Sequence, residues 1–435
     1  MNSQKTEKKH TEISIVGGGI AGITTAFHLG KKGYQVNLID PTLNSEINNL
    51  NPKNGTQASL GVLMGNIYKR SKGRAFLLRK KSMKLWKEWL TQINYSETDF
   101  ILEKPLIKLA SSDKEYQSMI ELSHNKKNYG IELLDKNSLD FWNSIFETRL
   151  IGGLISREDG RLNPIKLIKS LMESLDQMKI NKIDKSVIRI SKNSNLNDKS
   201  WTINLENNQS INQDYIIICS ALNTQNLLKP LGHEILLEPI LGQVIELELK
   251  KETPNWKKWP AILNYQSINF IHHKPNRMLI GATVEKGTKP SQLDKQKMLN
   301  LKNGSPKWMI NAKVCHEWSG IRARPTNEAA PLLKQLEPGL LINTGHYRNG
   351  VLLAPACAEW IGLQIEGQYR SKTTVMQNSG LPIGESPHIL VTPFPRTQKA
   401  SGWLLLPTTA MTSAEEVPVD IQRTQPSTRT AICVR

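Results

Sequence analysis

The chain has 435 residues, of which 38% are hydrophobic, and its formal net charge is +18. This length predicts about two or three domains, and no apolar stretch reaches the ~20 residues that a membrane-spanning helix needs. The polar first ten residues lack the apolar core of a signal peptide, so we expect a cytoplasmic protein. Four widely spaced cysteines without a CxxC pair argue against a disulfide framework and a zinc site.

The positive charge alone does not indicate a nucleic-acid partner. Lys and Arg are spread along the whole chain in small clusters such as Arg79-Lys80-Lys81, without a long basic run. No helix-turn-helix, zinc-finger or RNA-binding motif accompanies them. A solvated basic surface is therefore the expectation.

The most informative segment runs from residue 13 to residue 40. A β-like apolar run at 13–16 leads into the glycine turn Gly17–Gly22, and a second apolar run at 36–39 ends at Asp40. In a dinucleotide-binding unit the first glycine permits a tight turn, the second lets N–H groups approach a pyrophosphate, and the third brings helix and strand together. Asp40 follows Gly22 by 18 residues, which suits a carboxylate that binds ribose hydroxyls. The segment predicts dinucleotide binding.

Polar and helical segments follow this unit. Residues 41–55 are rich in Asn and predict a loop, whereas apolar spacing over 73–94 predicts an amphipathic helix. Residues 112–150 indicate short helices and loops. We expect a strand and turn at 152–164, whose final proline fits the first turn of a helix over 164–178.

Strand patterns dominate the middle of the chain. Residues 200–219 predict a hairpin followed by a buried strand, 239–249 are β-like, and 268–283 add two strands separated by a turn. This change of pattern predicts an antiparallel sheet inserted between parts of the nucleotide-binding domain.

The last predicted elements are a strand at 340–345 and a helix that begins at Gly350 and is capped by Gly367. Beyond about residue 370, Thr, Ser and Pro replace Lys and Asn. Residues 371–435 are therefore predicted to be a poorly ordered tail, in which Trp403–Leu406 is a candidate docking element.

Six motifs spread over residues 12–366 form a combined pattern. They are the Gly17–Gly22 turn with Asp40; Gln57-Ala58-Ser59 followed by Gly61-Val62-Leu63; DGRLNP at 159–164; GATVE at 281–285; WSGIR at 318–322; and GHYRNGVLLAP at 345–355. This pattern resembles the D-amino-acid oxidase family of FAD enzymes, most closely its glycine oxidase branch, which serves thiamine biosynthesis. The last motif is the most specific of the six.

The resemblance implies an α/β fold in which a Rossmann-like FAD-binding domain holds an inserted, mainly antiparallel β substrate domain. The expected FAD-binding parts are 11–95, 151–237 and 311–370. The expected substrate-domain parts are 96–150 and 238–310.

The resemblance also implies which residues hold FAD, through the glycine turn, the segment after residue 56 and the C-terminal motif. Val187 is a further candidate for a backbone contact to the adenine, although an apolar strand residue is as often simply part of the core. The implied set is Gly17, Gly18, Gly19, Ile20, Ala21, Gly22, Asp40, Gln57, Ala58, Ser59, Gly61, Val62, Val187, His346, Tyr347, Asn349, Gly350, Val351 and Leu352.

Two arginines inside the motifs, Arg322 and Arg348, are implied to hold the substrate carboxylate. A guanidinium suits this role because its planar fork forms two parallel charge-assisted hydrogen bonds. The alternative is that both arginines form surface ion pairs, as most arginines do.

The implied reaction is oxidation of the C–N bond of glycine or another small amino acid or amine, with hydride transfer from the α-carbon to flavin N5. An imine forms, and molecular oxygen then yields hydrogen peroxide. No dedicated acid–base residue is needed if the amine binds in its neutral form. Two alternatives stay open: a D-amino-acid or sarcosine dehydrogenase that uses another acceptor, and a flavin-binding protein without catalysis.

The chain departs from the family pattern at three places. Asn269 or Phe270 stands where the family often has a substrate-contacting tyrosine, Ala221 replaces a usual glycine, and Val62 replaces a usual methionine. The substrate preference is therefore open.

Other residues with chemical potential do not form a site at the sequence level. His272, His273 and His346 lack an acid or Cys at ligand spacing, so no metal site is predicted. Cys315 precedes the WSGIR motif but matches no flavin-attachment pattern, which favours a buried free thiol.

Overall fold

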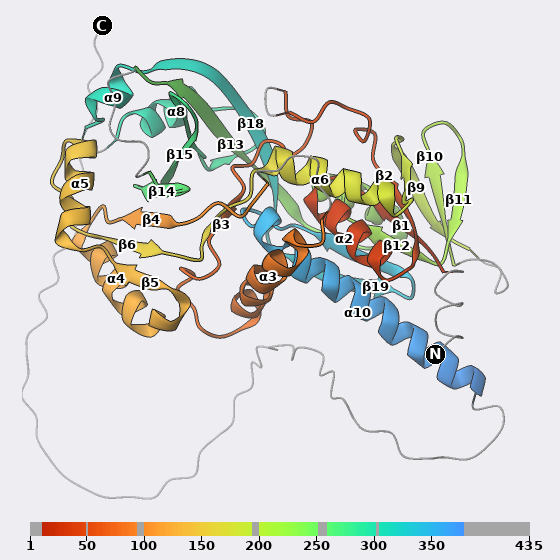
Figure 1. Cartoon of the computed structure of the whole chain (residues 1–435). Helices are drawn as coiled ribbons and strands as arrows, with labels where there is room; N and C mark the ends of the chain where they lie inside the picture. Colours follow the sequence, from red (N-terminus) through yellow and green to blue (C-terminus); the bar gives the residue numbers. More distant parts are fainter. Residues whose placement is uncertain are drawn as a thin grey trace, which may run out of the picture. The chain divides into compact units, whose positions relative to one another are not determined.

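The computed structural model describes residues 11–48, 51–93, 100–193, 200–250, 259–301 and 304–377. It contains a mostly parallel sheet covered by helices and a second, mostly antiparallel sheet (Figure 1). Within these ranges, no helix combines the length and the apolar character that crossing a membrane requires.

The first sheet has six strands in the order β19-β20-β12-β1-β2-β8. β19 is antiparallel to β20, and the other pairs are parallel. Strand β12 is buried at every residue, which explains its unbroken apolar sequence, because both faces of a parallel sheet are covered. The strands are β1 (Glu12–Val16), β2 (Gln35–Ile39), β8 (Asn181–Ile183), β12 (Tyr215–Ile218), β19 (Leu332–Glu337) and β20 (Leu340–Thr344).

Two layers cover this sheet. On one face, Ile15 and Ile217 pack into a core shared with helices α2, α3, α6 and α10. On the other face, Val16 and Ile218 pack against the antiparallel sheet β11-β10-β9. The helices are α2 (Ile20–Lys31), α3 (Arg74–Leu90), α6 (Pro164–Gln177) and α10 (Gly350–Gln377), and the strands are β9 (Val187–Lys192), β10 (Trp201–Leu205) and β11 (Ser210–Gln213). Successive side chains along β1 and β12 thus point alternately into the two covering layers, which gives a three-layer arrangement.

The second sheet follows the order β17-β13-β16-β15-β14-β4-β6-β5, and β18 also pairs with β13. Only the β14–β4 pair is parallel among these described ladders. The strands are β4 (Leu106–Leu109), β5 (Ile131–Leu133), β6 (Gly153–Ser156), β13 (Leu237–Glu248), β14 (Ile262–Tyr265), β15 (Ile268–Lys274), β16 (Arg277–Gly281), β17 (Glu285–Lys286) and β18 (Lys313–Pro325).

One face of the second sheet carries an aromatic core. Phe270 packs edge-on against Phe146 and Trp308, at ring-centroid distances of 5.7 and 6.3 Å. These rings come from α5 (Lys136–Phe146) and α9 (Lys307–Ile310), which lie on this face with α8 (Gln292–Leu299). Because these helices cover one face of the second sheet, the other parts of the chain pack on its opposite face.

The observed elements match the predicted ones closely, with two differences. α10 does not end at Gly367 but continues to Gln377, because Gly367 lacks the positive φ of a helix-terminating glycine. Strands β6 and β18 lie in ranges expected for the FAD-binding part, yet both pair within the second sheet. Residues 378–435, with Trp403–Leu406, fall outside the described residues.

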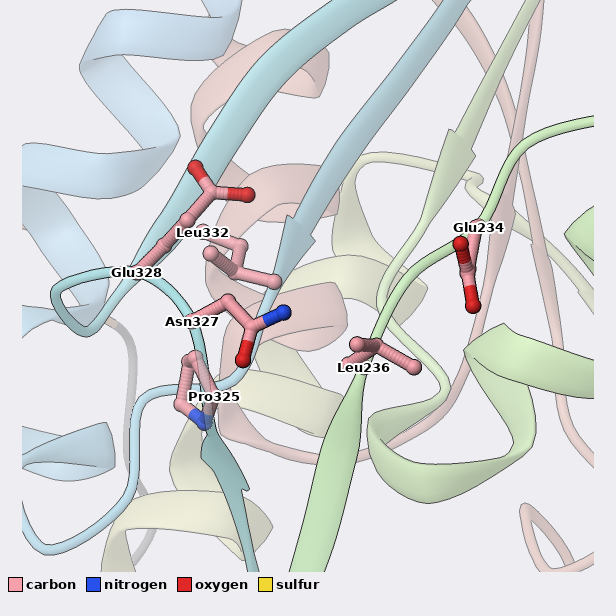
Figure 2. A pocket seen from close by; sticks show the side chains of 6 residues that line it. All are labelled: Glu234, Leu236, Pro325, Asn327, Glu328 and Leu332. Atoms are coloured by element: carbon pink, nitrogen blue, oxygen red, sulfur yellow. The ribbon is translucent and has the colours of Figure 1, made fainter.

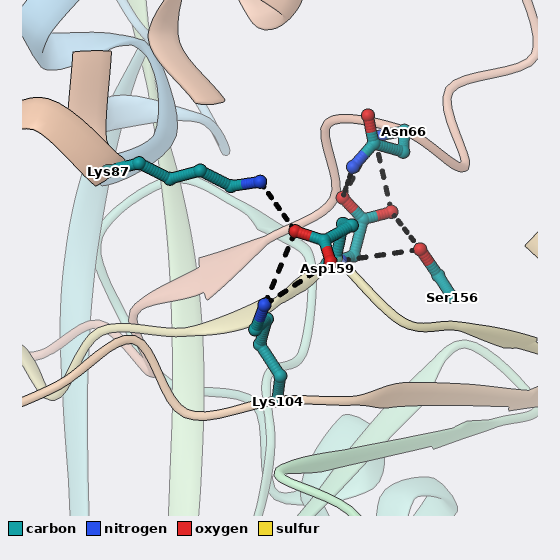
Figure 3. A network of polar contacts seen from close by, with 6 residues as sticks. Asn66, Lys87, Lys104, Ser156 and Asp159 are labelled. Atoms are coloured by element: carbon teal, nitrogen blue, oxygen red, sulfur yellow. Dashed lines mark hydrogen bonds and ion pairs between the residues drawn. The ribbon is translucent and has the colours of Figure 1, made fainter. Parts of the chain in front are cut away.

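A buried carboxylate ties the loop after β3 (Val62–Leu63) to β7 (Gly160–Arg161) (Figure 3). Asp159 is fully buried and accepts hydrogen bonds from the N–H groups of Gly65, Asn66 and Ile67 at 2.8–2.9 Å. The hydroxyl of Ser156 donates a fourth bond, at 3.0 Å. Burial raises the pKa of Asp159, and these donors oppose that rise.

The loop is also held through its carbonyl groups. Lys126, at the end of α4 (Asp113–Asn125), is 2% exposed and donates to the carbonyl oxygens of Asn66, Tyr68 and Arg70. Residues 65–70 are thus fixed by one buried acid and one buried base.

We predict that Asp159→Ala lowers the free energy of unfolding by about 3 kcal/mol or more, because three backbone N–H groups lose their buried acceptor. The neighbouring Glu158 is the control, since it is partly exposed and pairs with Lys87 and Lys104 at 2.5 and 3.3 Å. Glu158→Ala should cost less than about 1 kcal/mol. Urea unfolding of both variants tests this, and equal losses would contradict it.

Candidate functional site

A cleft of about 1050 Å³ opens at the carboxyl ends of β1, β2 and β12. This is the edge where open α/β sheets bind nucleotides. The cleft reaches the second sheet, whose Asn264 and Asn269 also line it. A separate hollow of about 100 Å³, lined by Glu234, Leu236, Pro325, Asn327, Glu328 and Leu332 (Figure 2), is too small for a dinucleotide.

The glycine turn borders the cleft, and its first and third motif glycines, Gly17 and Gly22, leave no room for a side chain. Gly17 has a φ of 119°, and a Cβ on it would lie 2.7 Å from the Cys219 carbonyl carbon. A Cβ on Gly22 would lie 1.8 Å from the Gly17 oxygen. α2 begins at Ile20 without an acidic residue in its first turn, so its N-terminus keeps its partial positive charge.

Asp40 follows β2 and is held by donors on both sides. Its carboxylate accepts hydrogen bonds from the Gly18 N–H at 2.7 Å and from the N–H and hydroxyl of Thr42 at 2.9 and 2.6 Å. A carboxylate can accept about four hydrogen bonds. One acceptor position is therefore left for a ligand hydroxyl at the rim of the cleft.

The segment after residue 55 forms another wall. Ala58, Ser59, Gly61 and Val62 line the cleft, whereas the buried Gln57 turns away and accepts a hydrogen bond from the Lys53 N–H at 2.8 Å. Thr56 was not predicted, but its hydroxyl accepts a hydrogen bond from the Ile20 N–H at 3.0 Å.

Three buried polar atoms of cleft-lining residues have no hydrogen-bond partner within the described structure. They are Ser59 Oγ, Arg79 Nε and His346 Nε2. Buried polar atoms are rarely left without a partner, so such atoms in a cleft mark the place of a polar ligand. A dinucleotide with a polar ring system meets this requirement.

The motif at 345–352 crosses the cleft and starts α10. Gly345 and Tyr347 have φ values of 64° and 54°, which bend the backbone sharply before the helix. His346, Tyr347, Asn349, Gly350 and Val351 line the cleft, and Leu352 is buried in the helical core. Burial, with the charge of Arg74, lowers the pKa of His346 to about 4, so its imidazole is neutral near pH 7.

The remaining residues predicted to hold the cofactor also fall into two groups, those that line the cleft and those that do not. Gly19, Ile20, Ala21 and Val187 line the cleft, and Gly18 and Gly22 lie behind its surface. Ala221, where the family has a glycine, also lines it and adopts a φ of 49°. A left-handed alanine costs about 1–2 kcal/mol relative to glycine, so the backbone there keeps the glycine-like shape at an energetic cost.

Arg322, on β18, lies flat on the second sheet. A Cβ on Gly242 would lie 2.2 Å from its Nη2, so only a glycine there leaves room for the guanidinium. Its Nη1 donates to the carbonyl oxygens of Leu241 and Thr283, each at 3.2 Å. Burial, and the nearby charge of Arg348, lower the pKa of Arg322. No ion pair involves Arg322 among the residues that the structure describes.

A row of polar side chains crosses the same face of the second sheet. Lys108 on β4 faces Asn264 on β14, which faces Asn269 on β15, and Gly281 comes next on β16. The Asn264 amide donates to the Asn269 side-chain oxygen at 2.8 Å. Phe270, the other candidate for a substrate contact, belongs to the aromatic core on the opposite face. The register thus selects Asn269.

Charge along the cleft is strongly unbalanced. Two acids, Asp40 and Glu115, line its described part. Seven cationic side chains do so: Lys53, Lys69, Arg79, Lys108, Lys185, Arg322 and Arg348. The sequence alone does not reveal this cluster, because the seven residues are spread over the chain from Lys53 to Arg348. The cleft suits a ligand with several negative charges.

These features define a dinucleotide-binding protein with an arginine free of ion pairs, among the described residues, beside the nucleotide site. The sequence model of the FAD dependent oxidoreductase family (DAO) matches residues 12–362. The chain belongs to this family, and its cofactor is FAD. The glycine turn, Asp40 and the unpartnered Ser59 Oγ and His346 Nε2 all fit that cofactor.

Known proteins with similar sequences include glycine oxidase of Bacillus licheniformis, 19% identical over 371 residues that cover 83% of this chain and 94% of the relative. The bifunctional protein ThiO/ThiG of Nostoc sp. is 21% identical over 80% of this chain, which spans 52% of that relative. Among solved structures, glycine oxidase from Bacillus cereus aligns with a TM-score of 0.69 at 19% identity, over 82% of this chain and 97% of that chain. That structural likeness supports the fold.

We predict that Gly22→Ala weakens FAD binding by at least about tenfold, because the new methyl group would overlap the Gly17 carbonyl and open the turn. Gly367→Ala is the control, since a Cβ there meets no atom within 4 Å. Absorbance titration of the flavin-free proteins with FAD measures both affinities. An unchanged dissociation constant for Gly22→Ala would disprove the role of this contact.

The neutral state of His346 predicts a loss of stability in acid. Its folded-state pKa of about 4 lies below the unfolded value near 6.5. The stabilisation is therefore complete above pH 6.5 and is lost as the pH falls towards 4. In flavin-free protein, His346→Asn should reduce the drop in unfolding free energy between pH 7 and pH 5 by about 2 kcal/mol. His124→Asn, at an exposed position, should keep the wild-type drop.

Proposed function

We propose that this protein is an FAD-dependent oxidase that converts the C–N bond of glycine or another small amino acid or amine into an imine, with oxygen reduced to hydrogen peroxide. The observation that carries the proposal is Arg322. Its guanidinium lies on Gly242 beside the cofactor cleft and donates only to carbonyl oxygens among the described residues. A carboxylate is the ligand that such a guanidinium binds best.

The residues of the chain act by positioning the substrate. Arg322 binds the carboxylate of an amino acid, and Arg348 adds a second positive charge at the exposed side of the cleft. The Asn264–Asn269 amide pair offers hydrogen bonds to the rest of the substrate. Bound FAD supplies the two-electron acceptor, so the protein is needed for orientation and for exclusion of water.

Glycine is the first substrate to examine. The relatives named glycine oxidase and ThiO/ThiG favour it and also suggest a role in thiamine biosynthesis. The buried free thiols of Cys219 and Cys357 suit a reducing compartment, so we place the activity in the cytoplasm.

The proposal is tested by adding glycine, sarcosine and small D-amino acids to the FAD-loaded protein without oxygen and then admitting air. Bleaching of the flavin followed by peroxide supports the oxidase. Bleaching without peroxide would favour a dehydrogenase that uses another acceptor. A flavin that no amine bleaches would instead leave a binding protein without catalysis.

Arg322→Met should raise the KM for the substrate by about tenfold to a hundredfold, because hydrogen bonds between charged groups contribute about 1.5–3 kcal/mol. FAD content should not change. Arg157→Met, at a surface arginine that pairs with Glu132, is the control. Steady-state kinetics at varied substrate concentration measure the effect, and an unchanged KM would refute the carboxylate role of Arg322.

A further inference from the structure

Arg79 is a second cationic group in the cleft that the assigned chemistry does not use. It lies on α3, and its guanidinium stacks on the ring of Tyr68 at 4.1 Å from the centroid. Its Nη1 donates to the Ala75 carbonyl at 3.3 Å, and its Nε is buried without a partner. Among the described ion pairs, none includes Arg79. The guanidinium is therefore held in place but not neutralised.

The surroundings of Arg79 add to its uncompensated positive charge. Lys126, which is almost fully buried, is close enough for the charge of Arg79 to lower its pKa, after the larger effect of burial. Asp159 acts on Lys126 through its charge, but its carboxylate is occupied by the N–H groups of residues 65–67. Neither Lys126 nor Arg79 forms an ion pair with an acid among the described residues. A further anion beside Arg79 would relieve their repulsion.

Other cleft residues extend this positive wall. Lys69 is exposed next to Tyr68, and Lys108 stands at the end of the polar row that starts at Asn269. Two strand spacings place Lys108 about 10 Å from Asn269. Lys108 pairs with Glu115 at 2.5 Å, which leaves Arg79 as the partly buried, unpaired cation. The polar row continues through Gly281 to Val244 on β13. Arg322 lies over Gly242, which precedes Val244 by two residues and is on the same face of the sheet.

We infer that Arg79, stacked on Tyr68, forms a second anion-binding site in the cleft, and that the substrates handled best are amines with a second acidic group. This inference rests on the proposed function, in which Arg322 binds the first carboxylate. Arg79 is a specificity-determining residue here: its pre-oriented fork binds the distal acid and contributes little when the substrate has none.

The test compares substrates that differ only in the distal charge: D-glutamate with D-glutamine, and D-aspartate with D-asparagine. The wild-type FAD-loaded protein should favour the acid of each pair by tenfold or more in kcat/KM. Arg79→Met should raise the KM for the acids by about tenfold to a hundredfold and leave kcat and the kinetics of glycine unchanged. Arg79→Lys should restore part of the preference.

Lys80→Met is the matched control, since it removes the adjacent exposed charge of α3. No acid preference in the wild type, or equal losses for the acid and the amide in Arg79→Met, would overturn the inference and leave Arg79 with a structural role. Loss of FAD from Arg79→Met would overturn it as well.

A second measurement separates this inference from the proposed function. Glutarate, a dicarboxylate that cannot be oxidised at a C–N bond, is titrated calorimetrically into the FAD-loaded protein. Binding that weakens tenfold or more in Arg79→Met, but not in Lys80→Met, supports the site even if no amine bleaches the flavin. Absence of Arg79-dependent binding overturns the site even if small amines are oxidised.

Discussion

The contact between Gly22 and Gly17 is the constraint on which the rest of this structure depends. With no side chain at either position, α2 starts directly at the end of β1 and its N-terminus faces the cleft. The same approach lets Asp40 reach the Gly18 N–H from the end of β2. A bulkier residue in this turn would move the helix, and the positive helix end and the Asp40 carboxylate would no longer face the same cleft.

The second sheet complements this nucleotide site because its two faces have opposite characters. The aromatic core with Phe146, Phe270 and Trp308 fills one face, whereas the other face carries the polar row beside a smaller apolar cluster that includes Trp318. Gly242 on that face makes room for the Arg322 guanidinium, and Gly281 follows Asn269 in the row that ends at Lys108. Residues far apart in the chain are thereby brought to one cleft.

Much of the fold could be predicted because its signals are local. The glycine turn, the buried β12 strand and the Pro164 helix start are set by short-range chemistry, and the structure has them where the sequence predicts them. The predicted end of α10 at Gly367 was wrong, because a glycine can either cap a helix or lie within it. Strands β6 and β18 pair within the second sheet. This pairing was not predicted, because it depends on strands that are distant in sequence.

The site was predictable only where a motif encodes it. The motifs supplied Arg322, Asp40 and His346, all of which line the cleft. Thr56, Asn264 and Arg79 were not predicted, because their roles arise from strand register and loop packing. The choice of Asn269 over Phe270 likewise required the register that places each on one face of β15.

The most direct measurement for the account is an absorbance titration of the purified, flavin-free chain with FAD. The chain should form a yellow complex with one FAD, whose visible spectrum shifts when a simple carboxylate occupies the position beside Arg322. A chain that stays colourless at saturating FAD, or a spectrum that no carboxylate perturbs, would contradict it.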